Sequence, residues 1–272
     1  VPGRISASSA VGVSNANVVA KAAAGAGIES RYGTAAPPVK CRPMLILALE
    51  TSTELGSCAL WRDGVVTERI CPPGKSHSET LLPLVRELLA KAGVKVGQLD
   101  AIAFGVGPGA FTGLRVACGA AQGLAVATNR PLIPVTSLEA MAYLAGAERV
   151  LALLDARMGE VYSGSYRLID GAYVLHGDIR VSAPDAVALP SEPGWIACGN
   201  AIAAYPVLAE RLNTAGLPVQ ADILPTAAAL TRLAAPRVGR GEGIDAALAA
   251  PLYVRDKVAK TVAERLSEGG RA

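Results

Sequence analysis

Residues 101–138 read AIAFGVGPGAFTGLRVACGAAQGLAVATNRPLIPVTSL. The apolar run from Ala101 to Val106 predicts a buried strand, and residues 107–113 form a glycine-rich turn. A helix is predicted from Leu114 to about Ala127, and a short strand from Pro131 to Val135. This order of strand, turn, helix and strand is typical of an α/β fold.

The predicted helix carries small and apolar residues on nearly every side. Its polar residues Thr112, Arg115 and Gln122 fall on one line, because steps of three and seven return to the same helix face. A helix that is apolar all round must be buried by its own domain or by a partner. The density of Ala and Gly lets another backbone approach closely, so we expect a protein–protein interface here.

The composition bounds the class of protein. The 272 residues are 51% hydrophobic and 18% charged, as expected of a globular chain rather than a disordered one. A net charge of +3 does not by itself indicate nucleic-acid binding. The five cysteines and two histidines lack the spacing of a zinc site, so we expect no metal and reduced thiols in the cytoplasm. The uncharged run 116–129 is too short to span a membrane, which takes about 20 residues.

Residues 1–43 differ from the rest of the chain. They are rich in Ala, Gly and Ser, have five basic residues and the single acid Glu29, and show no periodicity. We expect a disordered leader or a non-native extension, with a natural start at Met44. The composition also suits an organelle transit peptide.

The first regular elements are predicted to be strands. Residues 44–49, 58–61 and 65–70 have strand patterns, and Asp63-Gly64 is a hairpin signal. The turn after the first strand contains Thr51-Ser52-Thr53. A strand, a hydroxyl-rich turn, a strand and a hairpin open the actin-like ATPase fold, in which this turn lies along nucleotide phosphates. Ser and Thr also occupy turns for local hydrogen bonding, and both interpretations stand.

The next helix is predicted to begin near His77. Ser76 and Glu79 have the spacing of a capping box. The apolar residues form two adjoining stripes, wide enough for a core and a partner, at positions 81, 82, 84, 85, 88 and 89. A metal-binding HxxxH would need a second histidine at position 81, which is Leu. We interpret His77 as a helix-start or interface residue.

The glycine-rich turn does not fit the standard nucleotide motifs. Pro108 and Leu114 stand where a Walker A loop needs Gly and Lys. The Rossmann pattern requires an acid about 20 residues on, and none occurs before Glu139. What remains is a turn at a helix N-terminus with Thr112 as the expected N-cap. Arg115 opposes the helix dipole there, which suggests either a nearby anion or a snorkelling side chain.

The second half repeats the strand-rich plan. Strands are predicted over 150–154, 160–166, 172–176 and 195–198, and helices from about 200 to 212 and over 226–233. Asp155 is either a ligand or base residue or the local partner of Arg157. We therefore predict two lobes, 44–145 and 146–272, and the second has a basic tail that includes Lys257, Lys260 and Arg265.

Five segments spread over residues 44–256 carry specific motifs. They are Ile46–Thr53, His77-Ser78-Glu79-x-Leu81-Leu82-Pro83, Gly107–Arg115, Asp155-Ala156-Arg157-x-x-Glu160-Val161-Tyr162 and Pro251-x-Tyr253-x-Arg255. Together these segments resemble the bacterial TsaB (YeaZ) family of tRNA threonylcarbamoyladenosine biosynthesis proteins. The resemblance implies a two-lobed actin-like ATPase (ASKHA, ribonuclease H-like) fold with a duplicated strand–helix plan.

The resemblance also implies a function. It predicts a non-catalytic subunit that binds and activates the TsaD transferase. The ATPase TsaE would complete the assembly, and the chain would reach tRNA through the complex. The chain would have no cofactor of its own, apart from ATP or ADP at the partner interface, and would form a homodimer when alone. The implied interface residues are His77, Glu79, Leu81, Leu82, Val85, Arg115, Cys118, Gly119 and Gln122. The implied degenerate nucleotide turn comprises Thr51, Ser52, Thr53, Gly107, Gly109 and Thr112.

One position departs from the family pattern. Glu50 ends the first strand, where the family usually has Asp, and this change makes independent ATP chemistry less favourable. The alternative is a self-sufficient ATP-dependent transferase or a kinase-like ASKHA enzyme, suggested by the Thr51-Ser52-Thr53 turn and Asp155. A peptidase has little support, because no histidine lies in a motif with a nucleophilic Ser or Cys.

Overall fold

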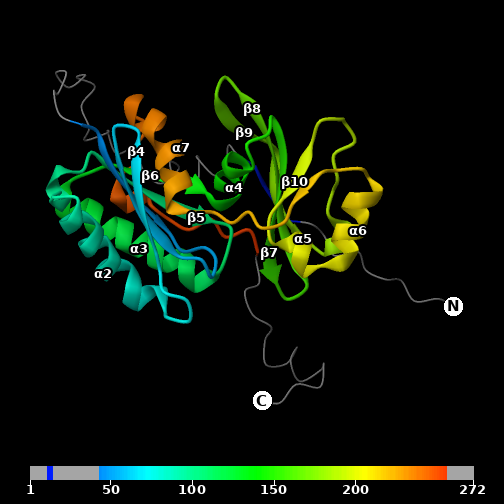
Figure 1. The fold of residues 1–272 in the computed structure, drawn as a ribbon, viewed down its shortest axis with the longest axis horizontal. Helices are drawn as coiled ribbons and strands as arrows, with labels where there is room; N and C mark the ends of the chain where they lie inside the picture. Colours follow the sequence, from blue (N-terminus) through cyan, green and yellow to red (C-terminus); the bar gives the residue numbers. More distant parts are fainter. Residues whose placement is uncertain (1–10, 15–42, 256–272) are drawn as a thin grey trace, which may run out of the picture.

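Two β-sheets lie side by side in the computed structural model, each with helices against it (Figure 1). The structure describes residues 11–14 and 43–255. We call the part built on the first sheet the N lobe and the part built on the second sheet the C lobe. This arrangement confirms the predicted two-lobed α/β fold.

The N-lobe sheet has five strands in the order β4-β3-β2-β5-β6. β2, β3 and β4 are antiparallel neighbours, whereas β5 and β6 run parallel to β2. The strands span Leu45–Glu50 (β2), Ser57–Arg62 (β3), Val65–Ile70 (β4), Ala101–Gly107 (β5) and Leu132–Thr136 (β6). Asp63 and Gly64 form the β3–β4 turn with positive φ, as predicted.

The C-lobe sheet repeats this plan. Its order is β1-β9-β8-β7-β10-β11, in which β9, β8 and β7 are antiparallel and β10 and β11 continue in parallel. The strands span Arg149–Arg157 (β7), Glu160–Ile169 (β8), Ala172–Ser182 (β9), Ile196–Cys198 (β10) and Val219–Gln220 (β11). The series β9-β8-β7-β10-β11 matches β4-β3-β2-β5-β6 strand for strand, which confirms the predicted duplication.

Residues 11–14 correct the expectation for the N-terminal segment. Val11–Ser14 forms strand β1, which pairs antiparallel with β9 at the edge of the C-lobe sheet. The rest of the predicted leader, 1–10 and 15–42, lies outside the described residues.

Helices cover both faces of the N-lobe sheet. α2 (His77–Lys91) and α3 (Phe111–Thr128) pack on one face, where Leu47 and Leu49 of β2 point. α7 (Ala227–Gly239) packs on the other face, against Ile46 and Ala48. β2 is therefore buried on both faces, as its continuous apolar run predicts.

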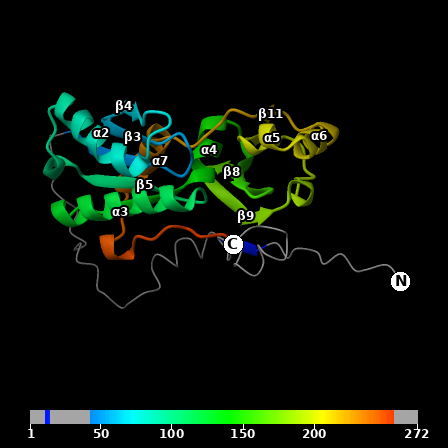
Figure 2. The same ribbon diagram turned by 90° about the horizontal axis from the view of Figure 1, so that it is seen from below.

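The end of the chain returns to the N lobe. α7 lies on the N-lobe sheet, and residues 244–254 then run beside α3 (Figure 2). The Leu252 amide donates to Val106 O over 2.7 Å, and Leu132 exchanges backbone hydrogen bonds with Ile244. The predicted C-terminal unit 146–272 is therefore not one spatial unit. The basic residues Lys257, Lys260 and Arg265 lie outside the described residues.

Several helix ends differ from the prediction. α3 begins at Phe111 with Ala110 as the N-cap, which places Thr112 inside the first turn and not at the cap. Thr136 caps α4 (Ser137–Ala145), in place of the expected Ser137. The helix predicted from about 200 to 212 is broken at Pro206 into α5 (Ala201–Ala204) and α6 (Pro206–Thr214). A proline lacks the amide that would have continued the first helix.

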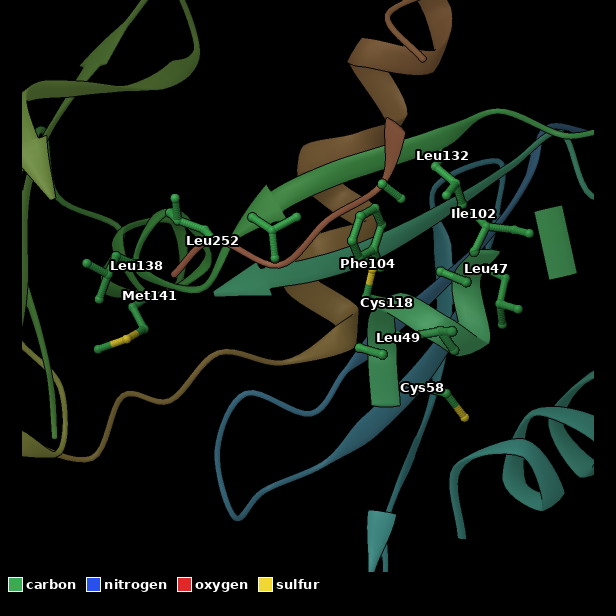
Figure 3. Packing of buried hydrophobic residues seen from close by; sticks show 14 of the residues in the cluster. Leu47, Leu49, Cys58, Ile102, Phe104, Cys118, Leu132, Leu138, Met141 and Leu252 are labelled. Atoms are coloured by element: carbon green, nitrogen blue, oxygen red, sulfur yellow. The ribbon is translucent and has the colours of Figure 1, made fainter. Parts of the chain in front are cut away.

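One hydrophobic cluster connects the two lobes. It contains Phe104 of β5 and Cys118 of α3, and it continues through Leu138 and Met141 of α4 toward the C lobe (Figure 3). Leu252 of the returning segment belongs to the same cluster. The lobes therefore share buried apolar surface, which stabilises their relative position.

Gly113 marks the closest approach in the N lobe. A Cβ atom built on Gly113 would lie 1.8 Å from Thr51 O, a backbone atom that cannot move aside easily. A Cβ atom on Gly119, six residues further along the same helix, would meet nothing within 4 Å. The two glycines have opposite surroundings, because Gly113 faces the end of β2 and Gly119 is exposed.

We predict opposite effects of one substitution at these two positions. Gly113→Ala should lower the free energy of unfolding by about 3 kcal/mol, because the methyl group overpacks against a backbone carbonyl. Gly119→Ala should raise it by about 0.5–1 kcal/mol, because alanine loses less backbone entropy in a helix. Chemical denaturation of the two variants measures both. A Gly113→Ala variant as stable as wild type would contradict the described packing.

Candidate functional site

A cleft of about 320 Å³ lies between the lobes. Its N-lobe wall comes from the turn after β2 and from the first residues of α2 and α3, and its C-lobe wall comes from the end of β7. The side chains with polar groups on these walls are Thr51, Ser52, Thr53, Glu54, Ser76, His77, Ser78, Thr112, Asp155, Arg157, Tyr162 and Asn200. The cleft therefore brings together the predicted hydroxyl-rich turn, the start of α2, Thr112 and Asp155.

The hydroxyl-rich turn is packed against the start of α3. Thr51 Oγ1 donates to Gly113 O over 2.7 Å, and the Ala110 amide donates to Ser52 O over 2.7 Å. A Cβ atom on Gly109 would lie 2.4 Å from Ser52 O. Thr51 and Ser52 are at most 2% exposed. The glycines of this turn thus accommodate backbone of the chain itself.

This packing already uses one of the donors that a phosphate at the start of α3 would need. A phosphate at a helix N-terminus needs free amide donors, and here the Ala110 amide is already satisfied by Ser52 O. The carbonyl oxygens of Thr51 and Ser52 also face the start of the helix and would repel a phosphate. Gly107 lies further back, against Leu114 and Leu252 O. We derive no phosphate chemistry from these residues.

Glu50 is a buried carboxyl group below the turn. It is 0% exposed, Oε1 accepts from the Ser52 amide over 2.5 Å, and Oε2 has no hydrogen-bond partner among the described residues. A Cβ atom on Gly105 would lie 2.1 Å from Oε2, so the longer acid fits because position 105 is glycine. Desolvation by burial raises the pKa of Glu50, outweighing the opposing effect of the hydrogen bonds from residues 51 and 52.

The raised pKa of Glu50 predicts a pH-dependent contribution to stability. The native state holds the proton more tightly than the unfolded state, in which the ordinary pKa is 4.5. The contribution is fully present below pH 4.5 and is lost as pH rises through the native pKa. Glu50→Gln stays neutral and should therefore gain stability relative to wild type as pH rises from 4.5 to 7. Urea denaturation across this range measures the difference, and a constant difference would contradict a raised pKa.

His77 is the first residue of α2, as predicted, and lies at the cleft. A Cβ atom on Gly56 would be 2.6 Å from His77 Nε2 and 3.1 Å from Cys71 Sγ, so the ring packs on the backbone at Gly56. Ser76 caps the helix by accepting from the Ser78 amide over 3.3 Å. The imidazole is therefore held at the cleft wall by local packing.

Asp155 pairs locally with Arg157, which is one of the two roles that the sequence suggests for this residue. Its carboxylate lies 3.2 Å from Arg157 Nη1, and Oδ1 accepts from the Arg157 amide. Tyr205 also donates its hydroxyl to Oδ1 over 2.7 Å, and burial together with this contact raises the pKa of Tyr205 to about 12. Tyr205 comes from the C lobe 50 residues away, and no sequence pattern pointed to it.

Arg157 also reaches across the cleft. Its Nη2 lies 3.4 Å from Glu54 Oε2, so one exposed ion pair joins the end of β7 to the turn after β2. Exposed pairs of this kind contribute at most about 1 kcal/mol. This contact positions the cleft walls more than it stabilises the fold.

The predicted interface residues divide into two groups. Leu81, Val85 and Cys118 are at most 4% exposed and belong to the N-lobe core, so intramolecular packing already occupies these three side chains. Gln122 is half-buried and donates to the carbonyls of Ala246 and Ala249. The exposed or partly exposed members are His77, Glu79, Leu82, Arg115 and Gly119.

The outward face of α3 carries small and apolar residues, and α2 exposes Leu82 among charged side chains such as Glu79, Arg86 and Glu87. On α3, Gly119, Gly123 and Val126 are exposed, and Val126 keeps 73% of its surface. On α2, Leu82 keeps 49%. Both helices cover the same face of the N-lobe sheet, so their outward residues lie on one surface. Gly123 and Val126 were not predicted, although their spacing from Gly119 on the helix could have shown them.

The described residues hold neither a cluster of metal-ligating side chains nor a membrane-spanning helix. The described part of the chain contains no group of three or more His, Cys, Asp and Glu side chains that could hold a metal ion. Within residues 11–14 and 43–255, no helix is long and apolar enough to cross a membrane.

The duplicated lobes and the cleft between them define a two-lobed protein of the actin-like ATPase (ASKHA) class. Residues 70–261 match the model of the family described as TsaD, tRNA N6-adenosine threonylcarbamoyltransferase. Within this group the chain belongs to the TsaB family. It is 37% identical to the tRNA threonylcarbamoyladenosine biosynthesis protein TsaB of Escherichia coli (strain K12), over 79% of this chain and 96% of the relative. The TsaB protein of Haemophilus influenzae is 36% identical, over 79% of this chain and 95% of the relative.

Solved structures agree with this assignment. YeaZ from Pseudomonas aeruginosa is 42% identical with a TM-score of 0.69, and the alignment covers 77% of this chain and 99% of that one. A second structure is that of an uncharacterized Pseudomonas aeruginosa protein with similarity to peptidase YeaZ. It is 42% identical with a TM-score of 0.71, and the alignment covers 78% of this chain and 100% of that one. Both likenesses confirm the predicted family and fold.

Proposed function

We propose that this chain is a non-catalytic subunit that binds and activates a TsaD transferase in the formation of threonylcarbamoyladenosine on tRNA. The names of its TsaB relatives place them in that pathway. The observation that carries the proposal is the exposed surface of α2 and α3, formed by Leu82, Gly119, Gly123 and Val126. We call these four residues the docking face.

The docking face suits a partner that approaches closely. A Cβ atom on Gly119 or Gly123 would meet nothing within 4 Å, so another backbone can lie against the helix there. Val126 and Leu82 flank the glycines with exposed apolar surface, and burying it contributes about 25 cal/mol per Å². Glu79 and Arg115 are exposed at the cleft end of the same helices, and Glu79 provides a polar contact at the rim.

The packed turn at residues 51–53 supports a non-catalytic role. A self-sufficient ATP-dependent enzyme would need free amide donors for phosphate here, and the Ala110 amide is already bonded to Ser52 O. We propose that ATP or ADP, where it binds, lies at the interface with TsaD. It would then meet Ser78 and Thr112, which are exposed at the cleft wall.

The other members of the assembly follow from the same proposal. TsaE would complete the complex as its ATPase, and tRNA would be reached through the complex. When the chain is alone, the docking face would pair with a second copy, because its apolar residues are available to any matching surface. We propose that the complex works in the cytoplasm, in agreement with free thiols at Cys58, Cys71, Cys118 and Cys198.

We predict that Gly119→Leu weakens TsaD binding at least tenfold, about 1.4 kcal/mol. The leucine projects from the docking face and holds the partner away, while the open surroundings of Gly119 leave the fold unchanged. Isothermal titration calorimetry with purified TsaD measures the affinity, and thermal melting checks the fold.

Ala203→Leu is the matched control, because Ala203 is exposed on α5 in the C lobe. It should bind TsaD as wild type does. Equal affinities for the Gly119→Leu variant and wild type would remove the docking face from the proposal. Equal losses for both leucine variants would point to a contact spread over both lobes.

A further inference from the structure

A second groove lies next to the cleft, on the other side of the start of α3. It has a volume of about 220 Å³ and is lined by the closing segment of the described chain, the tip of the β7–β8 hairpin and the start of α3. Gly109, Ala110, Ala156, Arg157 and Tyr162 line both cavities, so the groove and the cleft adjoin each other. The groove includes Tyr253 and Arg255 of the closing Pro251-x-Tyr253-x-Arg255 motif, for which the proposed docking face gives no role.

Aromatic side chains and arginines concentrate here. Phe111 and Tyr253 have ring centroids 5.3 Å apart, and the Arg115 guanidinium lies 3.9 Å from the Phe111 centroid. Arg115 Nε donates to the Tyr253 hydroxyl over 3.1 Å. These contacts hold the Tyr253 ring in place while 41% of its surface stays exposed. An ordered and exposed ring is a preformed platform for stacking.

The charges around the groove favour an anion. None of its described lining residues is Asp or Glu. Arg157 and Arg255 are paired with carboxylates that lie outside the lining, Asp155 and Glu160. Arg115 has no carboxylate partner within the described ranges, and its charge is exposed at the groove edge.

The hairpin tip is held in a strained conformation. Arg157 and Met158 both have positive φ, 59° and 56°, although neither is glycine. Such residues persist where surrounding contacts hold them, and here Arg255 donates to the carbonyl oxygen of Ala156. Met158 keeps 59% of its surface exposed opposite Tyr253 in the groove lining, which adds a second apolar wall.

From these features we propose that the groove binds an unpaired nucleotide of an RNA strand, with the base on Tyr253 and a phosphate at Arg115. Stacking on aromatic rings combined with arginine contacts to phosphates is the general mode of single-strand binding. A strand is favoured over a free nucleotide because the adjoining cleft of about 320 Å³ offers space for a neighbouring nucleotide. The choice of RNA rests on the proposed function, whereas the stacking platform and the free arginine do not.

Fluorescence anisotropy of the full chain with a labelled single-stranded RNA dodecamer tests this proposal. Tyr253→Leu should weaken binding about tenfold, within the range of one lost base stack, and Tyr253→Phe should keep the affinity. Arg115→Gln should weaken binding and lower the slope of log K against log salt by about 0.7, the value for one phosphate contact on a single strand. Arg86→Gln is the matched control on exposed α2 and should change neither quantity.

Two competitors and one independent assay separate the outcomes. Failure of RNA to bind saturably, or equal affinities for the Tyr253→Leu variant and wild type, overturns the proposal. Displacement by polyglutamate of equal charge as effective as by RNA also overturns it, because charge alone would then explain binding. If AMP displaces the RNA when both are at the same concentration, the groove is assigned to a free nucleotide instead, and the proposal is overturned. TsaD binding by the Tyr253→Leu variant should stay unchanged, so failure here is distinct from failure of the docking face.

Discussion

The contact between Gly113 and the carbonyl oxygen of Thr51 sets the geometry of the N lobe. It brings the start of α3 against the end of β2, and Gly109 makes the same kind of approach to Ser52. Any side chain at position 113 would separate the two elements. The contact also shapes the cleft, because the turn that it holds in place lines the N-lobe wall. The same contact thus sets both the packing of the N lobe and the wall of the cleft.

The burial of Glu50 belongs to this arrangement. The longer acid lies under the turn with one oxygen unpartnered, and glycine at position 105 leaves it just enough room. A charged carboxylate at that depth would be costly, so the site favours the neutral acid. A neutral carboxyl group beneath the turn is a poor ligand for a metal–nucleotide complex, which agrees with the proposed non-catalytic role.

Much of the fold could be predicted from the sequence, because the apolar runs of β2 and β5 and the turn at Asp63-Gly64 are local signals. The return of α7 to the N lobe could not, because its apolar stripe fits either sheet and only tertiary packing decides. The candidate site was predicted in part. Motifs located the turn, His77 and Asp155, but a stripe on a helix does not show which side faces the core, and Leu81, Val85 and Cys118 proved to face inward. Tyr205 was missed because its contact with Asp155 is made only in the folded chain.

Reconstitution of threonylcarbamoyladenosine synthesis on tRNA tests the central claim most directly. The modified nucleoside would be measured by mass spectrometry with this chain, TsaD and TsaE together, and with each protein omitted in turn. We expect a high yield only when the chain and TsaD are both present, and no product from the chain alone with ATP. Product formed by this chain without TsaD would contradict a non-catalytic role, and an undiminished yield without this chain would contradict activation.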